Sequence, residues 1–122
     1  RLGDGVSFYK VGLTLLARPG GVAFAHALRA GGKQVFQDWK LHDIGAQVEG
    51  AARAVAEGGC DLLTVHAEPQ VMTGAVKGRD AAGSGTKLLA VTVMTPRRSD
   101  SATILTEVPG PTSYLVTLGT TR

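Results

Sequence analysis

Four short runs of apolar residues divide most of the chain. Each is rich in Val, Leu, Phe or Thr and brief enough to form a β-strand. Nearly continuous apolar runs are typical of parallel strands that are covered on both faces. The predicted strands are Val6–Gly12, Gln34–Leu41, Asp61–Ala67 and Lys87–Met94.

Segments with helical spacing lie between these runs. Apolar residues recur every three or four positions, as at Val48, Ala52 and Val55, which is the pattern of a helix with one buried face. The glycine pairs at 31–32 and 58–59 are typical helix stops. The sequence therefore predicts a strand followed by a helix, repeated along the chain.

This alternation indicates an α/β fold in a single domain, residues 1–122. An open doubly wound sheet and a barrel both fit the alternation. No G-x-G-x-x-G follows a predicted strand, which weakens the dinucleotide-binding form of the open sheet. A complete (β/α)8 TIM barrel takes about 250 residues, so we expect a partial barrel of about four βα units.

The tail after Pro96 has a different pattern. Residues 96–100 predict a loop, and Ser101–Val108 is consistent with one short helix. Pro109 and Pro111 prevent that helix from continuing. Tyr114–Leu118 is predicted to be a final strand or helix.

Composition narrows the class of protein. Hydrophobic residues make up 43% of the 122 residues and charged residues 19%, which is ordinary for a globular domain. The net charge of +3 is dispersed along the chain, so we expect no nucleic-acid partner. No apolar stretch approaches the length of a membrane span. The single cysteine, Cys60, excludes an internal disulfide, fits a cytoplasmic protein and is interpreted as a small buried hydrophobe.

The most polar feature of any predicted strand is the segment Asp38–Asp43. Strand alternation places Asp38 and Lys40 on the same face with Phe36, whereas Trp39 points the other way. In a barrel that face points inward, and active sites form where the strands end. A lysine between two aspartates stays protonated and can still deliver a proton. A structural ion pair is the alternative, but buried charges are costly, so we favour catalysis.

Other polar residues near the strand ends are weaker candidates. Lys10 ends the first apolar run and is expected on the neighbouring strand, at the same end of the sheet as Lys40. His66 is interpreted as a hydrogen-bonded histidine at a strand end. No histidine pair has metal-ligand spacing, so we expect no metal. Gly83–Lys87 lacks the spacing of a phosphate-binding loop.

Four segments, in order and spacing, resemble successive strands of bacterial orotidine 5'-phosphate decarboxylases. They are Phe8–Gly12, Val35–Ile44, Thr64–Ala67 and Leu88–Thr95. The D-x-K-x-x-D element alone belongs to a wider superfamily, but His42 and Ile44 around it make the resemblance specific. The match extends over roughly residues 5–95, and the tail 96–122 matches poorly.

This resemblance implies a homodimeric barrel that converts orotidine 5'-phosphate to UMP in pyrimidine biosynthesis without a cofactor. Lys40 corresponds to the proton donor, and Asp38 to the aspartate set against the substrate carboxylate. Asp43 corresponds to the aspartate supplied to the partner subunit's site, and Lys10 to a lysine that holds the charge network and the ribose. The resemblance also implies that Ile44, Gln47 and Thr95 bind substrate.

The chain departs from the family pattern at several positions. Gln47 stands where a threonine is usual, Gln37 replaces an apolar residue, and Pro96 replaces a serine. The family's first strand would lie upstream of Arg1, where no initiator Met is present, and its phosphate-binding strands are missing, so we expect an incomplete barrel. Two alternatives stay open. One is a magnesium-dependent sugar-phosphate aldolase or decarboxylase of the same superfamily, and the other is an inactive half-barrel that associates with itself.

Overall fold

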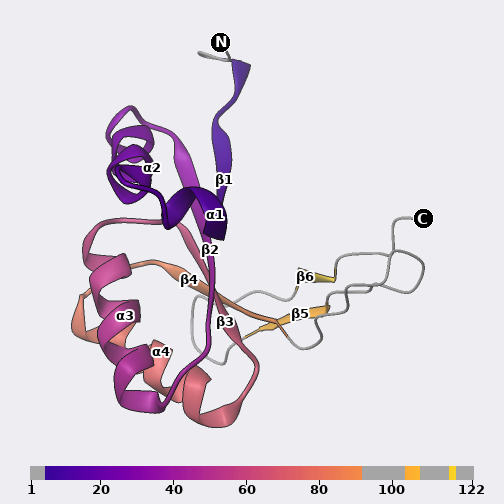
Figure 1. Cartoon of the computed structure of the whole chain (residues 1–122). Helices are drawn as coiled ribbons and strands as arrows, with labels where there is room; N and C mark the ends of the chain where they lie inside the picture. The colour runs from indigo at the N-terminus through magenta and orange to yellow at the C-terminus, as the bar shows by residue number, and fades with distance from the viewer. Residues whose placement is uncertain (1–4, 92–103, 108–115, 118–122) are drawn as a thin grey trace.

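A computed structural model describes residues 5–91, 104–107 and 116–117 of the chain, and Figure 1 shows the elements they form. Strands and helices alternate from β1 to β4, as the sequence predicts. In order, the elements are β1 Phe8–Gly12, α1 Leu13–Leu16, α2 Gly21–Ala30, β2 Gln34–Leu41, α3 Gly45–Glu57, β3 Leu62–His66, α4 Pro69–Ala81, β4 Lys87–Val91, β5 Ile104–Glu107 and β6 Val116–Thr117.

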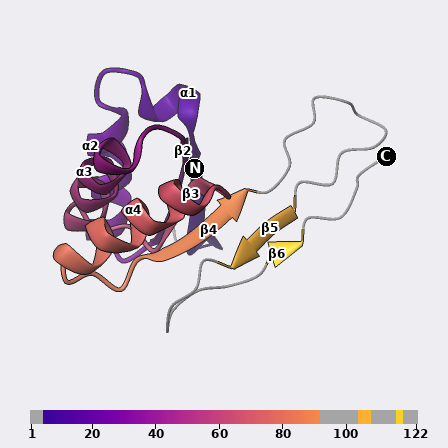
Figure 2. The ribbon, with the colours of Figure 1, turned by 90° about the horizontal axis from the view of Figure 1, so that it is seen from below.

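The strands form one sheet in the order of the sequence, β1-β2-β3-β4-β5-β6. The first four are parallel to one another, and helices α2, α3 and α4 lie on the same side of them (Figures 1 and 2). Four parallel strands with helices on one side are the arrangement expected of a partial (β/α)8 barrel, in which the other side faces the barrel interior.

The predicted helix at Ser101–Val108 is wrong. Ile104–Glu107 is a strand that pairs antiparallel with β4, so that Val91 lies opposite Leu105. Pairing with the exposed edge of β4 satisfies backbone groups that a short isolated helix would leave to water. Val116–Thr117 is a strand, one of the two predicted alternatives, and pairs with β5. The predicted loop at 96–100 lies outside the described residues.

The predicted helix stops are confirmed. Helix α2 ends at Ala30 and α3 at Glu57, each just before a glycine pair. In both pairs the second glycine has a positive φ, 84° at Gly32 and 80° at Gly59, a conformation that side chains with a Cβ rarely adopt. The glycines thus turn the chain into the following strand.

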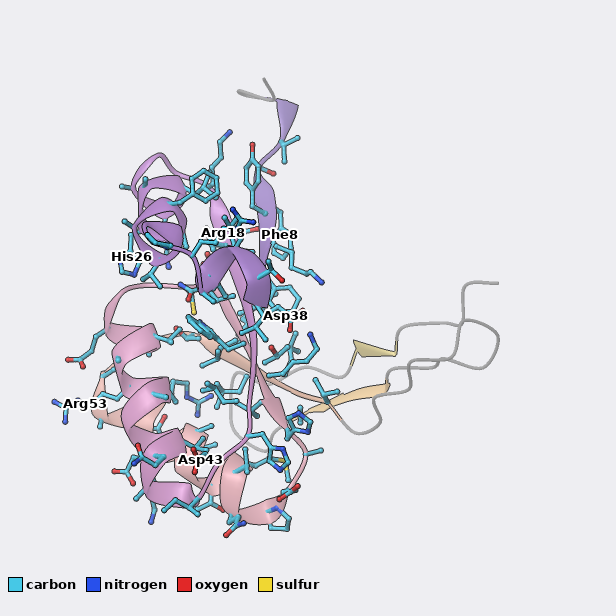
Figure 3. All side chains as sticks on the ribbon, in the orientation of Figure 1. Phe8, Arg18, His26, Asp38, Asp43 and Arg53 are labelled. Atoms are coloured by element: carbon cyan, nitrogen blue, oxygen red, sulfur yellow. The ribbon has the colours of Figure 1, made fainter. Side chains whose placement is uncertain are left out.

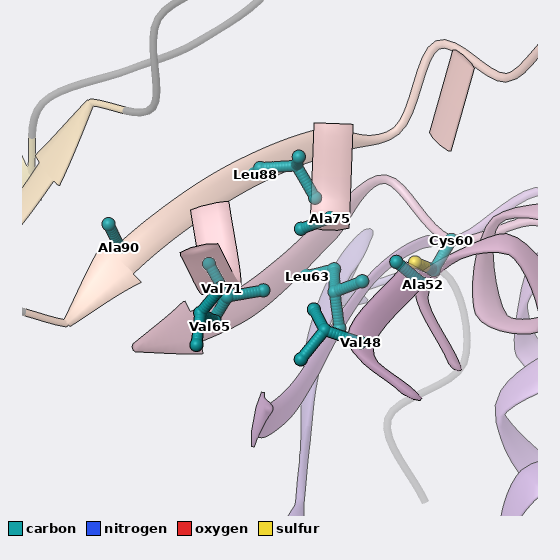
Figure 4. Close-up of a cluster of buried hydrophobic side chains, with 9 residues drawn as sticks. All are labelled: Val48, Ala52, Cys60, Leu63, Val65, Val71, Ala75, Leu88 and Ala90. Carbon is teal, nitrogen blue, oxygen red and sulfur yellow. The ribbon is translucent and has the colours of Figure 1, made fainter. Parts of the chain in front are cut away.

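The main core lies between β3, β4 and the two helices α3 and α4 (Figure 4). Leu63 and Leu88 are fully buried on this face, and Cys60 is 2% exposed among them, which confirms its interpretation as a small buried hydrophobe. The residues of the cluster are Val48, Ala52, Cys60, Leu63, Val65, Val71, Ala75, Leu88 and Ala90.

Helices α3 and α4 approach each other through glycine. A methyl group built on Gly74 would overlap the carbonyl of Gly45, and one on Gly78 would overlap the carbonyl of Glu49. The absence of side chains at these positions lets the two backbones pack closely. Within the described residues, no helix is long and apolar enough to cross a membrane.

Candidate active site

An irregularity in β2 shapes the centre of the site. Gln37 pairs with Leu63 and Leu41 pairs with Val65, so four steps along β2 run beside two steps along β3. The intervening residues Asp38, Trp39 and Lys40 therefore form a bulge opposite Thr64. Lys40 has a φ of 50°, the only positive φ among the described residues other than glycine. Bulges of this kind redirect side chains beside functional sites.

Asp38 lies at the centre of a charged cluster on the sheet face away from α3 and α4 (Figure 3). Its Oδ2 atom accepts hydrogen bonds from Lys40 Nζ at 2.8 Å and from Lys10 Nζ at 3.2 Å. The Asp38 side chain is 8% exposed, whereas those of Lys40 and Lys10 are 31% and 58% exposed. The predicted meeting of Lys10, Asp38 and Lys40 is confirmed, and both lysine side chains are partly exposed.

The charge state of Asp38 follows from these contacts. Burial by itself raises the pKa of this carboxyl, but hydrogen bonds from Lys40, Thr64 and Lys10 outweigh burial, and the pKa lies below its ordinary value. Asp38 is consequently ionised at neutral pH. An ionised carboxylate here carries a negative charge between the two lysine side chains that donate to it.

Thr64 is a site residue that the sequence analysis did not single out. Its Oγ1 atom donates to Asp38 Oδ1 at 2.7 Å and accepts from the backbone N–H of Lys40 at 3.0 Å. The side chain is 1% exposed. Thr64 could have been predicted from its position in the third apolar run, two residues before His66. Strand alternation turns it there toward the same face as Asp38.

The residues after Lys40 occupy a different place. Asp43 lies at the start of α3 (Figure 3), away from Asp38, and its Oδ1 atom accepts the backbone N–H of Ile44 at 2.7 Å. Ile44 is 62% exposed, and Gln47 is also exposed in the first turn of α3. The structure therefore does not bring Asp43, Ile44 and Gln47 into the Asp38 cluster. Thr95 lies outside the described residues.

Two histidines lie at the carboxyl ends of the strands. The rings of His42 and His66 stack with centroids 4.2 Å apart, and the Nε2 atom of His42 lies 2.7 Å from Glu68 Oε1. Burial, followed by the nearby His42 and Lys40, lowers the pKa of His66, although Glu68 acts in the opposite direction. In the described part of the chain, no three His, Cys, Asp or Glu side chains are grouped so that they could hold a metal ion.

The family model described as "Orotidine 5'-phosphate decarboxylase / HUMPS family" matches residues 1–116. The chain belongs to this family. Among curated relatives, the orotidine 5'-phosphate decarboxylase of Caulobacter vibrioides is 65% identical over 95 residues, which are 78% of this chain and 40% of the relative. That of Methylobacterium nodulans is 55% identical over 96 residues, with the same shares covered.

Two solved structures agree with the fold. The crystal structure of the Lactobacillus acidophilus decarboxylase matches with a TM-score of 0.65 and 37% identity, over 70% of this chain and 41% of that protein. An uncharacterised conserved protein from Geobacillus kaustophilus matches with a TM-score of 0.67 and 36% identity, over 79% of this chain and 47% of that one. The chain thus spans about 40% of the length of the curated relatives it matches.

Proposed function

We propose that this chain contributes the proton-donating half of an active site that decarboxylates orotidine 5'-phosphate to UMP, with Lys40 as the donor. The observation that carries the proposal is the ammonium of Lys40, held 2.8 Å from the buried, ionised Asp38 on the inner face of the sheet. Membership of the decarboxylase family supplies the substrate.

The proposed reaction replaces a carbon–carbon bond with a carbon–hydrogen bond. The bond between the pyrimidine ring and its carboxylate breaks, carbon dioxide leaves, and the electron pair stays on the ring carbon. Lys40 Nζ gives a proton to that carbon, and the neutral amine regains a proton from solvent. A fixed ammonium beside the developing carbanion lowers the barrier because it needs no reorganisation when the charge appears.

Asp38 and Lys10 support this step in different ways. Asp38 orients Lys40 through the hydrogen bond at 2.8 Å, and its carboxylate would lie near the carboxylate that the substrate loses. Lys10 shares Asp38 with Lys40 at 3.2 Å, yet is 58% exposed, so it retains hydrogen-bond donors for the ribose hydroxyls. One aspartate therefore orients a proton donor and a substrate-binding lysine together.

The proposal includes a second subunit. Asp43, Ile44 and Gln47 are exposed at the start of α3, and Asp43 lies apart from the Asp38 cluster of its own chain. We propose that these residues contribute to the active site of a partner copy, where Asp43 would add its carboxylate and Gln47 a polar contact to the substrate. An exposed isoleucine, 62% accessible, fits an interface between subunits.

The direct test is UMP formation from orotidine 5'-phosphate by the purified chain and by its Lys40→Ala variant. Lys77→Ala, which removes an exposed lysine from α4, is the matched control. We expect Lys40→Ala to lower kcat by more than about 100-fold, as loss of a general acid does. Adding EDTA and then Mg²⁺ separates this reaction from the magnesium-dependent chemistry of the superfamily, because only the latter would depend on the metal.

A hybrid protein makes the test independent of chain length. In it, residues 5–91 of this chain replace the matching segment of the Caulobacter vibrioides relative, which is 65% identical. Decarboxylation by the hybrid that is lost in Lys40→Ala supports the proposal. Equal turnover with and without Lys40 would contradict the role of this lysine, and an inactive but folded hybrid would contradict the assignment of the site.

A further inference from the structure

Thr64 lies opposite the bulge of β2, where the regular pairing between β2 and β3 is interrupted. Three residues of β2, Asp38, Trp39 and Lys40, are set against Thr64 alone, because the paired residues on either side are Gln37 with Leu63 and Leu41 with Val65. The Thr64 side chain points to the inner face and is 1% exposed. No water competes for its hydroxyl there, so its two hydrogen bonds are fixed by the protein.

The first hydrogen bond fixes the backbone of Lys40. At a φ of 50° the N–H of Lys40 leaves the direction of a regular strand, and a residue with a Cβ adopts this conformation at a cost. The N–H donates instead to Thr64 Oγ1 at 3.0 Å. Without that acceptor, a partly buried donor would lose its partner, which favours a different backbone conformation at Lys40.

The second hydrogen bond fixes Asp38. Thr64 Oγ1 gives its single proton to Asp38 Oδ1 at 2.7 Å, while both lysines use Oδ2. The two carboxylate oxygens therefore have different partners. Oδ1 binds Thr64 on β3, and Oδ2 binds the two ammonium groups. Because a carboxylate held at one oxygen cannot rotate freely, the position of Oδ2 and of the Lys40 ammonium is set from β3.

We propose that Thr64 is a positioning residue for proton delivery, whose one hydroxyl holds both the main chain of Lys40 and the carboxylate of Asp38. The inference rests on the proposed decarboxylation, since it assigns Thr64 to the same step. Thr64 acts through Lys40 and Asp38 rather than on the substrate. Its loss therefore lowers kcat and leaves KM nearly unchanged.

The test compares Thr64→Val with Thr64→Ser. Valine keeps the shape of threonine without the hydroxyl, and serine keeps the hydroxyl. The control is Thr86→Val, because Thr86 is also 1% exposed and donates at 2.7 Å, but to the carbonyl of Cys60, far from the charged cluster. Melting temperatures of all three variants show how much stability each buried hydroxyl contributes.

Two measurements are made on each folded variant. The Asp38 carboxyl is titrated by carbon-13 NMR, with Lys10 and Lys40 as the charged groups that face it. UMP formation gives kcat and KM. In Thr64→Val we expect a raised pKa of Asp38, because a hydrogen bond to its charged form is lost, and a fall in kcat of about tenfold or more. Thr64→Ser restores both, and Thr86→Val changes neither.

The outcomes separate this inference from the proposed function. If the folded hybrid that carries residues 5–91 forms no UMP, the proposed function fails, while the NMR titration of this chain still decides whether Thr64 controls Asp38. An Asp38 titration that is the same in Thr64→Val and in the unaltered chain would overturn the inference. So would a kcat that is unchanged in Thr64→Val, or one that falls equally in Thr86→Val.

Discussion

On the sheet face covered by α3 and α4, β3 and β4 present Leu63, Val65 and Leu88, all buried without charge. On the opposite face the same sheet presents Asp38, Lys40 and Thr64, which are joined by hydrogen bonds and ion pairs, beside a small apolar cluster that contains Leu89 and Val91. The first face is stabilised mainly by the apolar area that it buries. The second keeps partly exposed ammonium groups, and its hydrogen bonds fix atom positions more than they add stability. Alternation along the strands thus puts the stabilising side chains on one face of the sheet and the polar cluster on the other.

The largest expected effect comes from Asp38→Asn, which removes the charge that orients both lysines. We expect kcat for UMP formation to fall at least about 100-fold, as when one preorganised group of an active site is lost. The matched change on the helix side is Glu57→Gln, which breaks the exposed Arg53–Glu57 pair at 3.4 Å. Steady-state kinetics should show little change in kcat for Glu57→Gln. A comparable loss of kcat in Asp38→Asn and Glu57→Gln would contradict the difference between the two faces.

The next effect concerns stability alone. Gly78→Ala puts a methyl group against the carbonyl of Glu49, so α3 and α4 must separate. We expect a loss of about 1–3 kcal/mol in the free energy of unfolding, measured with urea, because the core is overpacked. Gly50→Ala is the control, since a methyl group there meets nothing within 4 Å, and it should raise stability by about 0.5–1 kcal/mol. The Asp38 titration should be the same in both variants.

A smaller effect is the acid sensitivity of the polar face. The pKa of Asp38 in the folded chain lies below the ordinary value of 3.8, so its stabilising contribution is complete above that pH. The contribution is lost as the pH falls from there through the lower pKa of the folded state. Urea unfolding across this range should show a shallower loss of stability in Asp38→Asn than in the unaltered chain. Asp43→Asn, at an exposed site, is the control, and an equal slope in all three chains would contradict the prediction.

The smallest effect is expected at Cys60. Burial first, with a lesser contribution from Asp61, raises the pKa of this thiol to about 11, although Thr86 and Arg29 act in the opposite direction. Thiol labelling at about pH 8 should therefore follow unfolding rather than occur in the folded chain. Cys60→Ala should cost about 1 kcal/mol and leave UMP formation unchanged. Rapid labelling of the folded chain would show that the helix-covered face opens.

Much of the framework could be predicted from the chain alone. Apolar runs gave the four parallel strands, glycine pairs gave the helix ends at Ala30 and Glu57, and alternation along one strand placed Asp38 with Lys40. These features are local, because each depends on residues a few positions apart. The helix expected at Ser101–Val108 failed because Ile104–Glu107 pairs with β4, and the edge of a distant strand decides that conformation.

The order of residues along β2 specifies which side chains alternate, and so which carboxylate and which lysine share a face. How these two side chains meet depends on the packing of β2 against β3. The bulge at Asp38–Lys40, the left-handed backbone of Lys40 and the use of Thr64 as a shared partner depend on the register between β2 and β3. Register is a property of two strands, and a hydroxyl 24 residues beyond Lys40 becomes its partner only when the sheet has formed.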